Sequence, residues 1–166
     1  MVVFDGQQDF FCTESHSKLK GNDLDRGLTS VDPFEGTWRL NFTKSMFNLS
    51  PSFQNVIAKI EAQDSSLKIN TGLMGFDGKL NRLQGAELLD SKDHPIPKDA
   101  NLFGASSMKC KRVNGNVVVT VFKKGRKELG RSLDVVSEDG KTITRTQRGR
   151  NAQGHPLDIV AVYEKQ

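Results

Sequence analysis

The fold class of this chain is decided by residues 110–150, which read CKRVNGNVVVTVFKKGRKELGRSLDVVSEDGKTITRTQRGR. Short runs of β-type composition are separated here by three turn sequences, Asn114-Gly115-Asn116, Lys124-Gly125-Arg126 and Glu138-Asp139-Gly140-Lys141. Asn and Gly tolerate the positive φ that tight hairpin turns need. Because such short links join neighbouring antiparallel strands, we predict an up-and-down meander for this half of the chain.

The same pattern extends back to Phe34, with turn residues about every 8 to 12 positions and another hairpin sequence at Asp77-Gly78-Lys79. No segment reads as a long helix. The sequence therefore predicts an all-β fold, an antiparallel up-and-down β-barrel of about 8–10 strands. Nine strands are expected, at residues 36–42, 53–63, 66–75, 79–90, 105–113, 116–124, 127–137, 141–149 and 157–165.

Residues 1–33 are rich in Asp, Ser, Gly and Lys without a sustained period, which predicts a flexible, irregular N-terminal tail before a barrel domain at 34–166. A chain of 166 residues is long enough for one such domain with a real core. The start lacks the features of a secretory signal, so we expect a cytoplasmic protein, or a secreted or periplasmic one if a native signal has been removed. No apolar run reaches transmembrane length, and no membrane span is expected.

Alternation along the strands predicts which side chains face the barrel interior, because successive residues point to opposite sides. In the last strand Leu157, Ile159, Ala161 and Tyr163 form the expected interior face. Two further strands are assigned in the same way, with interior faces made of Leu67, Ile69, Thr71 and Leu73, and of Leu129, Arg131, Leu133 and Val135. An interior that mixes aliphatic side chains with Arg, Tyr and Thr suits a barrel that encloses a small molecule. If a bulge shifts the register, Arg131 faces water instead.

A resemblance to a known family rests on the opening segment Phe34-Glu35-Gly36-Thr37-Trp38-Arg39-Leu40-Asn41, followed by Lys44-Ser45-Met46-Phe47. It resembles the start of small bacterial lipocalin-like domains, which are calycin-type barrels. The similarity covers residues 34 to 166 and includes three more segments, Asp139-Gly140-Lys141-Thr142, Asn151-Ala152-Gln153-Gly154 and Val160-Ala161-Val162-Tyr163-Glu164-Lys165.

The wider group of lipocalins and fatty-acid-binding proteins resembles this chain at both ends of the domain. The resemblance implies that Trp38 closes the barrel base and that Tyr163 matches a ligand-binding tyrosine. In fatty-acid-binding proteins an Arg stands two residues before that tyrosine, but Ala161 occupies the position here. Arg131 or Arg145, on neighbouring strands, is expected to supply the missing charge. Too little chain separates Leu40 from Phe53 for the two-helix lid of those proteins.

The predicted function is binding of a small, largely apolar ligand, a lipid or metabolite, inside the barrel. An acidic or carbonyl group of this ligand would contact Tyr163 and an Arg. The candidate ligand-binding residues are Tyr163, Arg131, Arg145 and Phe122. Trp38, Phe103 and Phe122 either contact the ligand or fill the barrel core, and the core role is favoured for Trp38.

Two alternatives stay open from the sequence. The first is a cofactor-free isomerase or cyclase that uses the same cavity, with Asp134, Arg131, Arg145 and Tyr163 as the groups nearest to acid–base chemistry. The second is an interaction module with a filled barrel that binds an acidic partner through the basic segment 123–127. Whether the protein is an enzyme, and its oligomeric state, are not predicted.

Other chemistry has little support in the residues. The net charge is +4, but aromatic residues do not interleave with the basic ones, so no nucleic acid is expected as a partner. His16, His94 and His155 lack metal-ligand spacing, so we predict no metal. No cofactor-binding fingerprint occurs, so no cofactor is expected. Cys12 and Cys110 give no disulfide framework, and Cys110 is interpreted as a small apolar side chain.

Overall fold

The computed structural model describes residues 31–96, 101 and 103–166, and every regular element in these ranges is a strand. All ten strands form one antiparallel sheet with the order β4-β3-β2-β1-β10-β9-β8-β7-β6-β5, which confirms the predicted all-β up-and-down fold. The strands are β1 Gly36–Phe47, β2 Phe53–Gln63, β3 Ser66–Gly75, β4 Leu80–Leu88, β5 Asp90–Pro95, β6 Ser107–Asn114, β7 Val117–Lys124, β8 Lys127–Val136, β9 Thr142–Arg150 and β10 Pro156–Lys165.

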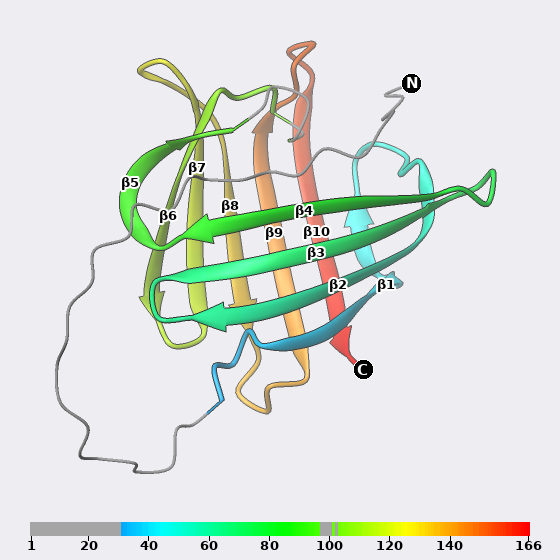
Figure 1. Ribbon diagram of the computed structural model, residues 1–166. Coiled ribbons are helices and arrows are strands. Elements are labelled where there is room, and N and C mark those ends of the chain that lie inside the picture. The colour runs from blue at the N-terminus through cyan, green and yellow to red at the C-terminus, as the bar shows by residue number, and fades with distance from the viewer. Residues whose placement is uncertain (1–30, 97–100, 102) are drawn as a thin grey trace, which may run out of the picture.

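The sheet curls into a nearly closed barrel. Figure 1 shows β2, β3 and β4 crossing β7 to β10 at a steep angle, so that the two halves of the sheet face each other. The first and last strands pair along their length, for example Leu40 opposite Tyr163. The two edges of the sheet, β4 and β5, carry no ladder between them, although β4 lies next to β5 and β6. We call this unpaired line the seam.

Glycines at the predicted turns explain why the hairpins form where they do. Gly78, Gly125 and Gly140 have φ values of 78°, 62° and 66°, a region that residues with a Cβ rarely adopt. Each sits in a link between sequential antiparallel strands. The predicted hairpins are therefore confirmed.

One strand was missed. The segment predicted as one strand at 79–90 ends at Leu88, and the separate strand β5 follows from Asp90 to Pro95. Its sequence, Asp-Ser-Lys-Asp-His-Pro, has no apolar alternation, and Ser91 has a φ of 61° at an irregularity in the pairing with β6. Strand assignment from β-type composition cannot detect such a polar edge strand.

Two hydrophobic clusters fill the two ends of the barrel. In one, Trp38 is fully buried and its Nε1–H donates to the Phe34 carbonyl over 2.8 Å, in agreement with a structural role. This cluster also contains Ile60, Leu67, Val118, Val136 and Ile143. The other is built from Leu40, Val56, Phe103, Ala105, Phe122, Leu157, Ile159 and Ala161.

The predicted interior faces are right for two strands and wrong for one. Leu157, Ile159 and Ala161 are buried, as is Leu67. On β8 the buried positions are Gly130, Ser132, Asp134 and Val136. The other face carries Arg131, whose side chain is 64% exposed. The prediction favoured the more apolar of the two faces, whereas the interior here has room for small and polar residues.

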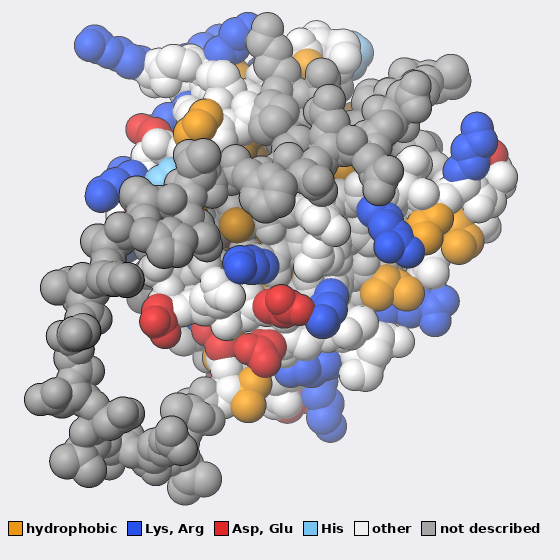
Figure 2. Space-filling view, viewed as in Figure 1, with side chains coloured by type: hydrophobic (Ala, Val, Ile, Leu, Met, Phe, Trp, Pro, Cys, Tyr) orange, Lys and Arg blue, Asp and Glu red, His pale blue; other side chains and the backbone are white. Residues whose placement is uncertain are grey.

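The outer surface carries an apolar area on the β3–β4 hairpin. Phe76 and Leu80 are 69% and 50% exposed, and hydrophobic side chains with Lys and Arg beside them gather over this hairpin in Figure 2. Among the described residues, no helix is long and apolar enough to cross a membrane. Residues 1–30, with Cys12 and His16, lie outside the described residues, so the flexible tail stays a prediction.

Candidate functional site

A layer of polar side chains separates the two hydrophobic clusters. On the inward face of β7, Thr120 lies between Val118 of one cluster and Phe122 of the other. Asp134 on β8 and Arg145 on β9 occupy similar middle positions. The polar layer therefore lies inside the barrel, away from both ends.

Asp134 and Arg145 form the centre of this layer. The guanidinium donates from Nε to Asp134 Oδ1 over 2.8 Å and from Nη2 to Oδ2 through a second, shorter bond. The Ser132 hydroxyl also donates to Asp134 Oδ1, over 3.1 Å. Asp134 is 5% exposed, and a paired, bidentate geometry is what a carboxylate at such a position needs.

Glu87, on the seam strand β4, adds a second carboxyl group. Its Oε1 lies 3.8 Å from Arg145 Nη2, while its buried Oε2 has no hydrogen-bond partner in the part of the chain that the structure describes. Burial raises the pKa of Glu87 to about 7; Arg145 opposes this effect and Asp134 adds to it. Glu87 is thus a buried carboxyl group that changes charge near neutral pH.

Tyr163, on β10, lies against residues of both hydrophobic clusters. Burial raises the pKa of its hydroxyl, an effect that Arg145 opposes and Asp134 reinforces. Unlike the indole of Trp38, this hydroxyl makes no hydrogen bond with any described residue. A half-buried phenol whose hydroxyl has no partner among the described residues can take a ligand or a water molecule as its partner.

Cys110, on β6, completes the layer. Burial, helped by the nearby Glu87, raises the pKa of the thiol to about 12, and the Thr120 hydroxyl donates to its Sγ over 3.5 Å. A thiol with this pKa stays protonated at neutral pH and is a poor nucleophile. Cys110 therefore acts as a small buried side chain, as expected.

An internal cavity of about 30 Å³ lies against this layer. Asp134, Arg145 and Tyr163 form its polar wall, and the remaining wall consists of Trp38, Ala58, Ile60, Ile69, Thr71 and Ile143. Such a space holds about one or two water molecules. Metabolite-sized pockets measure about 300–1,000 Å³, so the barrel is nearly filled in this conformation.

Comparison with known proteins identifies the fold. No family model matches the sequence, and no curated protein matches it significantly. Zebrafish ileal bile acid-binding protein, solved with cholic acid, matches with a TM-score of 0.54 and 10% identity over 81% of this chain and 99% of that one. The chain folds as a calycin-type barrel. Lobster apocrustacyanin A1 matches less well, with a TM-score of 0.44 and 12% identity over 81% of this chain and 61% of that one.

The calycin-type barrel brings together two of the four predicted ligand-binding residues. Tyr163 and Arg145 share one wall of the cavity. Phe122 instead packs on Phe103 in the hydrophobic cluster, with ring centroids 4.8 Å apart, and is absent from the cavity wall. A role for Phe122 in ligand binding stays a prediction. The resemblance to small bacterial lipocalin-like domains in particular also stays a prediction.

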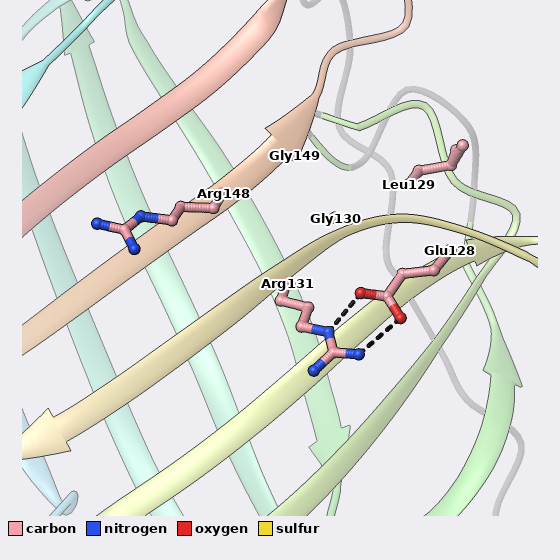
Figure 3. A pocket seen from close by; sticks show the side chains of 6 residues that line it. All are labelled: Glu128, Leu129, Gly130, Arg131, Arg148 and Gly149. Atoms are coloured by element: carbon pink, nitrogen blue, oxygen red, sulfur yellow. Dashed lines mark hydrogen bonds and ion pairs between the residues drawn. The ribbon is translucent and has the colours of Figure 1, made fainter.

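Arg131 lies on the outside of the barrel, so its predicted interior position is wrong. Figure 3 shows it with Glu128 beside an open hollow of about 380 Å³ on β8 and β9. Both Arg131 Nε and Nη2 donate to the Glu128 carboxylate. Arg148, across the hollow, donates to Asp158 over 3.1 Å. The hollow is thus an open surface whose two arginines already have partners.

The basic segment 123–127 forms the link between β7 and β8. Lys123 pairs with Asp93 at 2.9 Å, while Lys124, Arg126 and Lys127 are exposed. An interaction with an acidic partner through this segment stays a prediction. The described residues contain no group of three His, Cys, Asp or Glu side chains that could hold a metal ion.

Glu87 is the one polar-layer carboxyl group that sequence reasoning missed. Pairing gave a usable signal, because Glu87 stands opposite Leu67, a residue predicted and found to be interior. A strand position opposite an interior residue is itself interior. Ionisable residues are seldom buried, so residue type alone gives no signal for an interior acid.

Proposed function

We propose that this protein binds a small, largely apolar molecule inside the barrel, with the polar group of the ligand at the polar layer, beside the Tyr163 hydroxyl. The supporting observation is an apolar cavity that ends at a polar wall whose Tyr163 hydroxyl has no partner among the described residues. Most of the affinity would come from apolar area removed from water, at about 25 cal/mol per Å². A few polar contacts would fix the orientation of the ligand.

The polar wall is organised before a ligand arrives. Two hydrogen bonds to Asp134 hold the Arg145 guanidinium in one plane. Because this side chain is already ordered, little rotamer freedom would be lost on binding.

The seam offers a route of entry. The cavity of about 30 Å³ is too small for a metabolite, so the barrel must widen to admit one. β4 is hydrogen bonded to β3 alone, and its other edge lies next to β5 and β6 without a ladder. Movement of β4 away from β6 would widen the interior without breaking any strand ladder.

Native mass spectrometry of the purified full chain, followed by denaturation and analysis of released molecules, tests the proposal. We expect a stoichiometric small molecule, or, for an empty preparation, saturable binding of the apolar dye Nile red. Tyr163→Phe should weaken binding, whereas Arg131→Ala should not, because Arg131 lies outside. An empty protein that also fails to bind the dye would contradict the proposal.

A second candidate function is supported by Glu87. A buried carboxyl group with a pKa of about 7 suits a general acid or base at neutral pH. A cofactor-free isomerase would exchange a proton next to a substrate carbonyl. Incubation of the protein with a small β,γ-unsaturated ketone in D2O should then give deuterium incorporation that Glu87→Gln abolishes, and a rate equal to that of buffer would reject this candidate.

A further inference from the structure

The polar layer contains more acid than base. Arg145 is the one cation that contacts Glu87 and Asp134 among the described residues, and Asp134 occupies both its Nε and its Nη2. Glu87 is left with a single contact of 3.8 Å through Oε1 and none through the buried Oε2. When Glu87 is ionised, the layer therefore lacks one positive charge and one hydrogen-bond donor.

We propose that the ligand is a small apolar amine, bound as its ammonium ion with an N–H donated to Glu87. This inference rests on the proposed function and names the class of ligand. An ammonium group supplies both things that the layer lacks, a positive charge and donors. The free Tyr163 hydroxyl, which has lone pairs, can accept a second N–H.

A carboxylate ligand is disfavoured by the same charge balance. It would place a third acid beside the single guanidinium of Arg145. Ionised groups taken out of water are costly unless each is paired, and here two acids would compete for one cation. The sequence predicted an acidic or carbonyl group on the ligand, and the contacts of Glu87 favour an amine instead.

The position of Glu87 also suits an entering ligand. β4 forms one edge of the sheet and faces the seam, as Figure 1 shows at the front of the barrel. A molecule that enters between β4 and β6 would pass Glu87 before it reaches the apolar wall around Ile69. The ammonium would then stay near the seam, with the apolar chain directed inward.

Glu87 is the group that sets the pH dependence. The titratable or charged side chains that act on it are Arg145 on β9 and Asp134 on β8, with Cys110 on β6 close enough for Glu87 to shift its pKa. Burial raises the pKa of Cys110, and also that of Tyr163 on β10, so both stay neutral at pH 7. Binding of an ammonium ion requires ionised Glu87, and below its pKa the carboxyl proton must leave first.

Calorimetric titration of the full chain with n-hexylamine, hexanoate and 1-hexanol tests the inference. n-Hexylamine should bind most tightly, with an affinity that is level above about pH 7 and falls about tenfold per pH unit below it. Any binding of hexanoate should show the opposite slope, because it would require protonated Glu87. Glu87→Gln should lower the affinity for n-hexylamine at least about tenfold and remove the pH dependence of this affinity. Arg131→Gln should change neither the affinity nor its pH dependence.

The outcomes separate the two proposals. Tighter binding of hexanoate or 1-hexanol than of n-hexylamine would overturn the proposal of an amine ligand and leave the proposal of small-molecule binding intact. Unchanged n-hexylamine affinity in Glu87→Gln would do the same. No binding of any of the three probes, together with no binding of Nile red, would overturn both. If Glu87→Gln does not fold, the opposite pH slopes of the amine and the carboxylate in the unmodified protein decide the question.

Discussion

Asp134 and Arg145 stand directly opposite each other on β8 and β9, and both side chains point into the barrel, where two hydrogen bonds join them. Removal of one partner leaves the other as a buried, unpaired charge. We therefore expect Arg145→Met alone to lower the free energy of unfolding by about 3 kcal/mol. The combined change Arg145→Met with Asp134→Leu should cost much less. Urea unfolding measures both, and equal losses in the single and double variants would contradict this account.

Glu87 should make stability depend on pH in an unusual direction. Its pKa rises from 4.5 to about 7 on folding, so between these values the folded state holds a proton that the unfolded state has lost. The contribution of Glu87 to stability should consequently be largest below pH 4.5, fall as pH rises to about 7, and then level off, by about 3 kcal/mol in all.

The variant Glu87→Gln isolates this contribution from those of other groups. The difference in unfolding free energy between the variant and the unmodified protein should grow in favour of the variant from about pH 5 to about pH 7. Urea unfolding at a series of pH values gives the difference curve. A flat curve would show that Glu87 titrates normally in the folded state.

Gly130 should not tolerate a side chain. A Cβ at this position would lie 2.3 Å from Cε1 of Phe103, a fully buried ring. Overpacking of this kind costs about 1–3 kcal/mol, so Gly130→Ala should be clearly destabilised. Gly85→Ala is a matched control on another strand, because a Cβ there would meet nothing within 4 Å. Thermal unfolding compares the two, and Phe103→Leu should partly rescue Gly130→Ala.

The seam should open more readily than the rest of the sheet. β4 and β5 each have one hydrogen-bonded neighbour, whereas β9 and β10 have two. Backbone amides of β4 and β5 should exchange with deuterium sooner, because local opening there breaks fewer hydrogen bonds. Mass spectrometry of peptic fragments tests this order. Uniform exchange across the barrel would argue against entry of a ligand through the seam.

The hairpins and most strands could be predicted from the sequence because local chemistry determines them. Turns such as Asp77-Gly78-Lys79, where Gly78 has a φ of 78°, demand a conformation that few other residues accept, and this demand does not depend on tertiary contacts. The strand β5 could not be found in this way. Its stability comes from pairing with β6, for example Asp93 opposite Lys109, and not from an apolar face.

The site was only partly predictable for a different reason. Tyr163 was assigned correctly because the rest of its strand is strongly alternating, so the apolar neighbours fix its face. On β8 both faces carry apolar residues, so alternation does not decide which face is interior, and the face that holds Leu129 and Leu133 was favoured over the one that holds Asp134. A buried acid is recognisable only when its partner is known, and Arg145 comes from another strand.

Because β4 and β5 are not hydrogen bonded to each other, the strands of this barrel could be connected in another order. Every pair of sequential strands is hydrogen bonded except these two, while the one pairing between strands distant in sequence joins β1 to β10. The first and last residues of the barrel segment also lie together, since Gln166 N–H donates to the Thr37 carbonyl over 2.9 Å. A circular permutant that links residue 166 to residue 31 and opens between Leu89 and Asp90 would retain Asp32 and make all ladders local. It should keep the same contacts with a lower contact order, and so fold faster than the natural connectivity.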